Sequence, residues 1–257
     1  MSVNVELYNG DCSEEMNKIA DNSIDLIVTS PPYDDLRDYN SIFDIDIISK
    51  QFFRILKKGG ILVWNVGDKT EEGSESMTSF KQAIALRGSG LKLNDTMIWR
   101  KSNPMPQVRQ SRYNQCFEYM FVFSKGSPKT FNPIMKRSKC GGQLYSSTCK
   151  KITKGKEREF KEFSINEEKI EDNIWTFAVA QNKTEHTAVF PLELPLRHIE
   201  SWTNKGDTVL DPFMGSGTTG IAAVQMDRNF IGIELEKRWF DLAKSQIEKA
   251  QENIFEM

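Results

Sequence analysis

The chain has 257 residues, 39% of them hydrophobic, which suits one α/β domain with an insertion. No apolar run approaches the roughly 18 residues that would span a membrane, and the N-terminus lacks the basic-then-apolar pattern of a signal peptide. We therefore expect no membrane partner. The four cysteines and two histidines lack the spacing of a zinc site, so we expect no metal centre.

Strand-like and helical segments alternate along the chain. Short runs rich in branched and aromatic residues predict strands at 3–8, 24–28, 61–66, 96–99, 119–124, 208–210 and 230–233. Apolar residues at a helical period and capping residues predict helices at 13–20 (Ser13 as N-cap), 45–56, 77–86, 192–202, from 218, and 236–251. Such alternation predicts an α/β fold with a mostly parallel, seven-stranded sheet and helices on both faces.

Residues Thr29 to Tyr33 read Thr-Ser-Pro-Pro-Tyr and directly follow the strand predicted at 24–28. Two consecutive prolines cannot continue a central strand, because neither provides a backbone N–H. The strand therefore ends there and presents the Ser30 hydroxyl, free carbonyls and the Tyr33 ring at its carboxyl end, where ligands bind in open α/β sheets. Taken alone, the segment is better explained as a simple strand-ending turn.

A glycine-rich turn runs from Asp211 to Gly220, with the sequence Asp-Pro-Phe-Met-Gly-Ser-Gly-Thr-Thr-Gly. It matches the pattern strand, G-x-G-x-x-G, helix, in which glycines allow a tight turn and a close approach of the backbone to a ligand. Glu234 ends the next predicted strand, about 19 residues beyond Gly215. A carboxylate roughly 20 residues on binds a ribose diol in such folds, so the pattern indicates an adenosine-containing cofactor.

Two carboxylates indicate which cofactor this is. Asp211 lies at the mouth of the turn, and Asp11 lies at the end of the first predicted strand. The pyrophosphate of a nicotinamide dinucleotide favours helix N–H groups without a nearby acid. Carboxylates suit the sulfonium and α-amino group of S-adenosylmethionine instead. A nicotinamide-dependent oxidoreductase stays an alternative, although it explains neither the Ser-Pro-Pro-Tyr motif nor the basic segment described next.

Positive charge is concentrated between residues 125 and 161, where eleven Lys and Arg residues oppose two Glu residues. Gly, Ser, Thr and Cys dominate 138–149, which suggests an insertion outside the sheet. An isolated charge run is usually a solvated loop, but an excess of one sign is expected of a phosphate-contacting surface. A non-catalytic nucleic-acid-binding protein would explain this charge, but not the two chemical motifs.

Together the motifs resemble those of the DNA amino-methyltransferases. Ser30-Pro31-Pro32-Tyr33 is similar to their (D/N/S)-P-P-(Y/F/W) motif, and Asp211 to Thr218 is similar to their glycine loop. Asn9-Gly10-Asp11 resembles their acidic turn at the cofactor adenine, and 186–194 resembles their segment that closes over the methionine part. The catalytic motif precedes the cofactor motif, with the insertion between them, which is the order of the family's β class.

The resemblance implies a Rossmann-like, S-adenosylmethionine-dependent methyltransferase fold of permuted motif order. It implies a catalytic half at 1–125, a basic target-recognition insertion at 126–173 and a cofactor-binding half at 174–257. The implied substrate is double-stranded DNA in the cytoplasm of a bacterial, archaeal or phage-infected cell, at the nucleoid. A cognate restriction endonuclease and a homodimer both occur in the family and stay open here.

The resemblance also implies the site residues. The catalytic residues are Ser30, Pro31, Pro32 and Tyr33. The cofactor-binding residues are Asp11, Phe190, Pro191, Asp211, Pro212, Phe213, Gly215, Gly217, Thr218, Thr219 and Glu234. The DNA-binding residues are Arg109, Arg112, Lys136, Arg137, Lys139, Lys150 and Lys151.

The implied reaction is methylation of an exocyclic amine on a flipped-out base. Ser30 Oγ and the Pro31 carbonyl would accept hydrogen bonds from the amine, and Tyr33 would stack on the base. No Pro-Cys pair occurs in the chain, which disfavours methylation at C5 of cytosine through a cysteine nucleophile. Serine at the first motif position favours cytosine N4, with adenine N6 as the alternative. Methylation of RNA or of protein amides is a more distant alternative.

Overall fold

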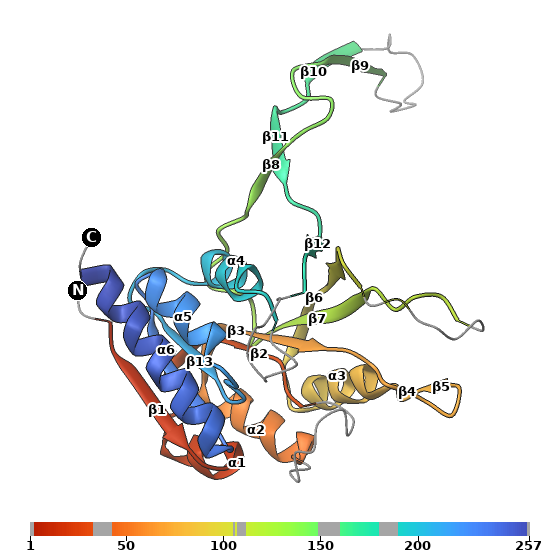
Figure 1. The fold of residues 1–257 in the computed structure, drawn as a ribbon. Coiled ribbons are helices and arrows are strands. Elements are labelled where there is room, and N and C mark those ends of the chain that lie inside the picture. The colour runs from red at the N-terminus through yellow and green to blue at the C-terminus, as the bar shows by residue number, and fades with distance from the viewer. Residues whose placement is uncertain are drawn as a thin grey trace. The chain divides into compact units, whose positions relative to one another are not determined.

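The computed structural model describes residues 3–32, 43–104, 106, 112–148, 160–179 and 190–255. The chain divides into two compact units (Figure 1). Unit 1 comprises Met1–Asn132 and Asn173–Met257, and unit 2 comprises Pro133–Asp172. Within the described ranges, no helix combines the length and the apolar character needed to cross a lipid bilayer.

Unit 1 is built on an eight-stranded sheet with the order β1-β14-β13-β2-β3-β7-β6-β12. Five neighbouring pairs are parallel, and the pairs β3–β7 and β7–β6 are antiparallel. The strands are β1 (Val5–Asn9), β2 (Ile24–Thr29), β3 (Leu56–Val66), β6 (Lys92–Lys101), β7 (Phe117–Ser124), β12 (Ile174–Phe177), β13 (Thr208–Asp211) and β14 (Asn229–Glu234). A separate hairpin joins β4 (Thr70–Glu71) to β5 (Ser74–Glu75).

Helices cover both faces of this sheet. They are α1 (Cys12–Glu15), α2 (Ile45–Ile55), α3 (Thr78–Gly88), α4 (Glu193–Trp202), α5 (Thr218–Gln225) and α6 (Lys237–Phe255). Trp64 and Asn65 are consecutive in β3, so their side chains point to opposite faces. Trp64 Nε1 donates to Gln82 Oε1 of α3 at 2.9 Å. Met120, opposite Asn65 in β7, lies 3.5 Å from His198 Nε2 of α4. The α3 and α4 helices therefore lie on different faces.

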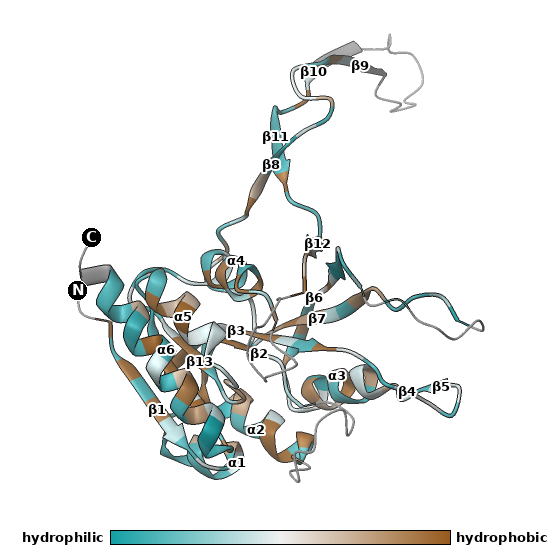
Figure 2. Ribbon diagram, in the orientation of Figure 1, coloured by the Kyte–Doolittle hydropathy of each residue, from teal (hydrophilic) through white to brown (hydrophobic). Residues whose placement is uncertain are grey.

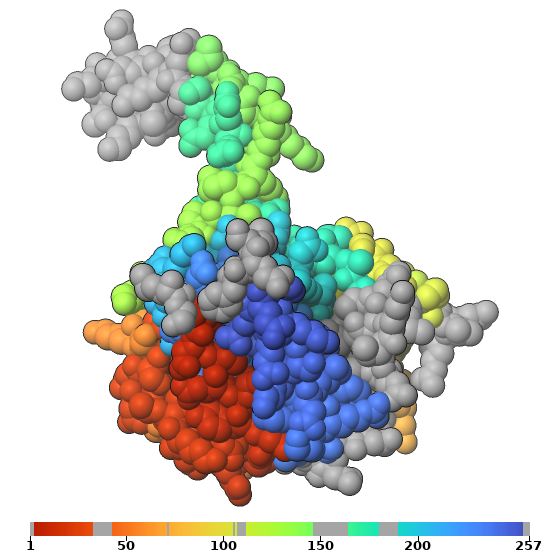
Figure 3. All heavy atoms as spheres, turned by 60° about the vertical axis from the view of Figure 1, so that its left-hand side comes forward, coloured from red at the N-terminus to blue at the C-terminus, as the bar shows by residue number. Residues whose placement is uncertain are grey.

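Apolar burial holds these layers together. Phe52 of α2 and Trp64 of β3 are fully buried in one core cluster beneath α2 and α3. On the other face, α5 contacts both α4 and α6. The α6 helix carries hydrophobic as well as hydrophilic residues (Figure 2), and it buries Ala243 and Ile247. Figure 3 shows α6, in dark blue, beside the N-terminal residues, in red, where Gln251 Nε2 donates to the Val3 carbonyl at 3.5 Å.

The predicted α/β class and mostly parallel sheet are confirmed, but the prediction of seven strands was wrong. The eighth strand, β12, is four residues long and pairs in parallel with β6 at the edge of the sheet. Its sequence alone is too short to indicate a strand, and its pairing partner lies far away in the chain. The prediction of Ser13 as an N-cap was also wrong. Asp11 caps α1, which ends at Glu15 and continues as a 3-10 turn, Met16–Lys18.

The described part of unit 2 consists of two antiparallel strand pairs. They are β8 (Met135–Arg137) with β11 (Glu168–Ile170) and β9 (Leu144–Thr148) with β10 (Phe160–Ser164). Pro133–Asp172 contains ten basic and seven acidic residues, so its charge is more balanced than that of 125–161. The Lys136 ammonium, for example, pairs with Asp172.

Four neighbouring parallel strands in unit 1 end at the same edge of the sheet. These are β1, β14, β13 and β2, and their last residues are Asn9, Glu234, Asp211 and Thr29. Each is followed by a segment that the sequence singled out. In open α/β sheets ligands bind outside the carboxyl ends of the strands, so this edge is where the site is to be found.

Candidate cofactor and catalytic site

A single pocket collects the segments that follow these four strands. It is open to solvent and lies outside the carboxyl ends of the strands, where ligands bind in open α/β sheets. Its lining residues are Gly10, Asp11, Cys12, Ser30, Pro32, Phe43, Pro212, Phe213, Gly215, Glu234 and Leu235. The two predicted motifs, 182 residues apart at Thr29 and Asp211, thus contribute to one cavity.

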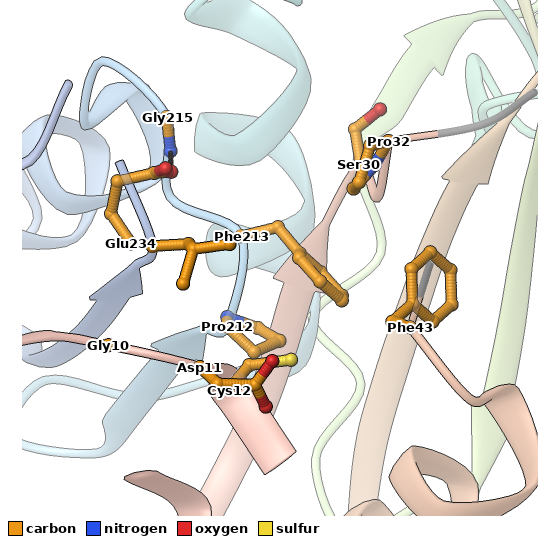
Figure 4. A pocket seen from close by; sticks show the side chains of 11 residues that line it. Gly10, Asp11, Cys12, Ser30, Pro32, Phe43, Pro212, Phe213, Gly215 and Glu234 are labelled. Carbon is orange, nitrogen blue, oxygen red and sulfur yellow. Dashed lines mark hydrogen bonds between the residues drawn. The ribbon is translucent and has the colours of Figure 1, made fainter. Parts of the chain in front are cut away.

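Glu234 organises the glycine turn on one side of the pocket. Its Oε2 accepts a hydrogen bond from Gly215 N at 2.9 Å, and its Oε1 accepts one from Glu236 N at 2.9 Å. In Figure 4, Glu234 and Gly215 lie on one side and Ser30 on the other, with Phe213 between them. Burial raises the pKa of the Glu234 carboxyl above its usual range. Each carboxylate oxygen has a second lone pair, which leaves capacity for a ligand hydroxyl.

Asp211 connects the two motifs through hydrogen bonds of its buried side chain. It is 1% exposed and does not line the pocket. Its Oδ1 accepts from Thr29 Oγ1 at 2.7 Å and from Phe213 N at 3.1 Å, and its Oδ2 accepts from Thr219 Oγ1 at 2.7 Å. Direct contact with a cofactor stays a prediction at this position. The geometry assigns Asp211 a positioning role, because it fastens the turn to the end of β2.

Burial raises the pKa of Asp211 to about 6, from an ordinary value of 3.8. The folded state therefore binds the proton more tightly than the unfolded state, and this group's contribution to stability falls as pH rises from about 4 to 6. Asp211→Asn keeps the shape without the charge. We expect the wild type to lose about 2 kcal/mol relative to this variant between pH 4 and pH 7. Chemical denaturation of both proteins across this range measures the difference, and a pH-independent difference would contradict it.

The other residues of the glycine turn shape its backbone. Gly217 has φ +87°, in the left-handed region, and a Cβ there would lie 3.1 Å from Ala243 Cα of α6. Glycine is therefore required for both conformation and packing. Thr218 begins α5 and Thr219 is buried against Asp211. None of these three lines the pocket, so their predicted cofactor contacts stay predictions.

On the other side of the pocket, Ser30 and Pro32 follow β2, as the sequence predicted, and both line the cavity. Pro31 is buried between them. Phe43 was missed by the sequence reasoning, because no motif contains it. Its ring lies 5.1 Å from that of Phe213, centroid to centroid, so the two rings form an apolar wall of the pocket.

Residues next to predicted positions were missed as well. Gly10 and Cys12 flank Asp11, and Leu235 follows Glu234. Their positions directly after strand ends could have predicted that they line the pocket. Asp11 lies in the pocket, where its Oδ1 accepts from Ser13 N at 2.8 Å. It therefore caps α1 while remaining part of the lining.

Several predicted residues lie elsewhere. Phe190 and Pro191 precede α4 and do not line the pocket. Arg112 pairs with Glu75 at 3.4 Å. Arg137 and Lys139 are exposed on unit 2. The predictions for Tyr33, Arg109, Lys150 and Lys151 lie outside the described residues.

The pocket fits S-adenosylmethionine in its chemistry. Glu234 can accept hydrogen bonds from ribose hydroxyls, two carboxylates suit a cationic ligand, and the rings of Phe43 and Phe213 suit its apolar parts. Its position at the carboxyl ends of parallel strands matches a nucleoside site. Fold and site together define the class of S-adenosylmethionine-dependent methyltransferases.

Comparison with known proteins gives the family. The model of a family described as DNA methylase, comprising the N6 and N4 methyltransferases, matches residues 24–245. The orphan methyltransferase M.BamHII of Bacillus amyloliquefaciens is 42% identical over 240 residues, covering 89% of this chain and 90% of that protein. The chain therefore belongs to the N6/N4 DNA methylase family and is a DNA amino-methyltransferase, and the oxidoreductase alternative falls away.

Solved structures of DNA methyltransferases agree with this family assignment. The M1.HpyAVI–SAM complex is 26% identical with a TM-score of 0.63, covering 94% of this chain and 99% of that one. The cytosine-N4-specific PvuII DNA methyltransferase is 21% identical with a TM-score of 0.71, covering 99% of this chain and 93% of that one, and shows the shared fold. S-adenosylmethionine is thus the cofactor, as predicted.

Proposed function

We propose that this enzyme transfers the methyl group of S-adenosylmethionine to the exocyclic N4 amine of a cytosine. The cytosine lies at a specific site in duplex DNA and is flipped out of the helix. The observation that carries this proposal is the placement of the Ser30 hydroxyl in the same pocket as the cofactor turn. Serine at this motif position favours cytosine N4 over adenine N6 in the family that the motif resembles. Adenine N6 methylation by the same mechanism is the second candidate.

The chemistry required of the protein is positioning. The lone pair of the exocyclic amine is delocalised into the base, which makes the amine a poor nucleophile. Ser30 Oγ and the Pro31 carbonyl accept hydrogen bonds from the amine and direct its lone pair. Bound S-adenosylmethionine supplies an electrophilic methyl group on its sulfonium. Transfer of this methyl group to the amine would be the chemistry that the cofactor supplies, and the residues that line the pocket would hold the two reactants. Much of the rate then comes from orientation.

The remaining site residues are assigned on the same basis. Asp11, Pro212, Phe213, Gly215 and Glu234 line the pocket and bind the cofactor in this proposal. Gly217, Thr218, Thr219 and Asp211 hold the turn, and Phe190 and Pro191 close over the cofactor. Tyr33 stacks on the flipped base.

Unit 2 contacts DNA in this proposal and recognises the target sequence. Its exposed Arg137 and Lys139 support this role, together with the basic residues of 150–158 in the sequence. The name of the 42% identical relative, an orphan methyltransferase, favours action without a cognate restriction endonuclease.

Sequencing with modification detection tests the proposal. DNA of cells that carry the chain on a plasmid is compared with that of cells carrying an empty vector. We expect N4-methylcytosine at one recurring short sequence, in the first sample alone. N6-methyladenine at a recurring sequence would replace cytosine by adenine as the target, and the absence of any modification would contradict site-specific DNA methylation.

A further inference from the structure

A line of polar side chains runs from Ser30 into the interior of the sheet. Asn65 Nδ2 donates to Ser30 Oγ at 3.5 Å and to Glu118 Oε2 at 2.8 Å. Glu118 Oε1 in turn pairs with Lys101 Nζ at 2.7 Å. Asn65 is 1% exposed and Glu118 is 7% exposed, so both are shielded from bulk water. None of the three residues beyond Ser30 lines the pocket.

The pairing of the strands creates this line. Trp64 of β3 pairs with Thr29 of β2, so Asn65 lies next to Ser30 where β2 ends. Asn65 faces Met120 of β7, and Glu118 lies two residues before Met120, on the same face of the sheet. The line is therefore fixed by the register of β2, β3 and β7, and not by a loop.

Packing alone does not account for the amide of Asn65. Its Oδ1 is buried and has no hydrogen-bond partner among the described residues. Such an atom costs folding free energy that an apolar side chain of similar size would avoid. Turning the amide by 180° would bring Oδ1 against the Glu118 carboxylate, so this carboxylate directs Nδ2 toward Ser30. The Asn65 amide thus leaves its Oδ1 without a partner, but it holds its Nδ2 donor in a fixed position at the Ser30 hydroxyl.

We propose that Asn65 and Glu118 are positioning residues for methyl transfer, which rests on the proposed role of Ser30. The Ser30 oxygen has two lone pairs. Asn65 Nδ2 occupies one of them and holds the side chain, and the other lone pair faces the target amine. Glu118, held by Lys101, keeps the Asn65 amide in this orientation. Neither residue touches the base or the cofactor.

The test is single-turnover transfer of tritiated methyl groups to duplex DNA, counted without regard to which base is labelled. Asn65→Leu is expected to slow transfer by about 10- to 100-fold, because a small misplacement of the reacting groups is enough for this. The Kd for S-adenosylmethionine is expected to stay within about twofold of the wild type, since binding does not depend on the Ser30 orientation. Its thermal stability is expected to fall modestly, because Glu118 Oε2 loses its donor at 2.8 Å although the unpaired Oδ1 is also removed. Rates are therefore compared per folded molecule, and a purely structural role would not combine a wild-type Kd for S-adenosylmethionine with slow transfer.

A double-mutant cycle tests whether Glu118 acts on Ser30 through Asn65. Glu118→Gln is expected to slow transfer by about tenfold, and Asn65→Leu with Glu118→Gln to be no slower than Asn65→Leu alone, because Glu118 acts through Asn65. Gln82→Leu makes a comparable change at a buried amide on the other face of the sheet. Its rate per folded molecule is expected to match the wild type.

Several outcomes would overturn the inference. These are wild-type rates in Asn65→Leu and Glu118→Gln, rate losses that multiply in the double variant, and an equal loss in Gln82→Leu. If Asn65→Leu does not fold, Glu118→Gln decides, because it preserves the size of the side chain and removes the carboxylate that fixes the Asn65 amide. A wild-type protein that labels no DNA would instead contradict the proposed function.

Discussion

Ser30→Ala is expected to slow methyl transfer by about 10³-fold while leaving cofactor binding nearly intact. The hydroxyl lies in the pocket across from the cofactor turn, so its loss removes an acceptor for the amine but no group that holds S-adenosylmethionine. Loss of one preorganised hydrogen-bonding group at a reacting centre costs about 10²–10³ in rate. Single-turnover transfer and cofactor titration, measured on the same preparation, separate the two effects.

Ser23→Ala is the matched control, since Ser23 precedes β2 at its opposite end and its Oγ donates to the Ala20 carbonyl at 2.7 Å. This variant is expected to transfer methyl groups at the wild-type rate. A fully active Ser30→Ala protein would remove Ser30 from the mechanism. Equal losses of transfer and of cofactor affinity would show that the substitution disturbs the pocket as a whole.

Glu234→Ala is expected to weaken S-adenosylmethionine binding by about 100-fold. The substitution removes two acceptor oxygens for ribose hydroxyls. Each hydrogen bond to a charged group is worth about 1.5–3 kcal/mol. Water that enters the emptied space offsets part of this loss of binding free energy. It also releases Gly215 N, which Glu234 Oε2 holds at 2.9 Å. Isothermal titration with S-adenosylmethionine measures the change.

Two further variants sharpen this experiment. Glu234→Gln keeps one acceptor oxygen and is expected to lose about tenfold in affinity, between the wild type and alanine. Glu236→Ala removes an exposed carboxylate two residues away and is expected to bind as the wild type does. Wild-type affinity in Glu234→Ala would contradict the assignment of Glu234 to the ribose.

The sequence predicted the two edges of the pocket because each motif directly follows a strand. Two prolines end β2 and leave Ser30 at its carboxyl end, and the glycines of the turn after β13 require the conformation that the structure has at Gly217. Parallel strands bring their carboxyl ends together, so local sequence was enough to place Ser30, Phe213 and Glu234 around one cavity.

The parts that were missed depend on contacts between distant segments. Phe43 belongs to no motif and reaches the pocket only because α2 begins beside it. Cofactor contact at Asp211 stays a prediction, and the hydrogen bond that its carboxylate accepts from Thr29, 182 residues away, is given by no local pattern. The link from Asn65 to Glu118 requires the antiparallel register of β3 and β7, which no local pattern gives.

The most direct test of amine methylation in this pocket uses the purified chain, duplex DNA that contains its target sequence, and S-adenosylmethionine with a deuterated methyl group. The DNA is digested and its nucleosides are identified by mass spectrometry. We expect the deuterated methyl group on N4 of deoxycytidine. Label on N6 of deoxyadenosine would contradict the choice of cytosine, and label on C5 of cytosine or on no nucleoside would contradict methyl transfer to an exocyclic amine.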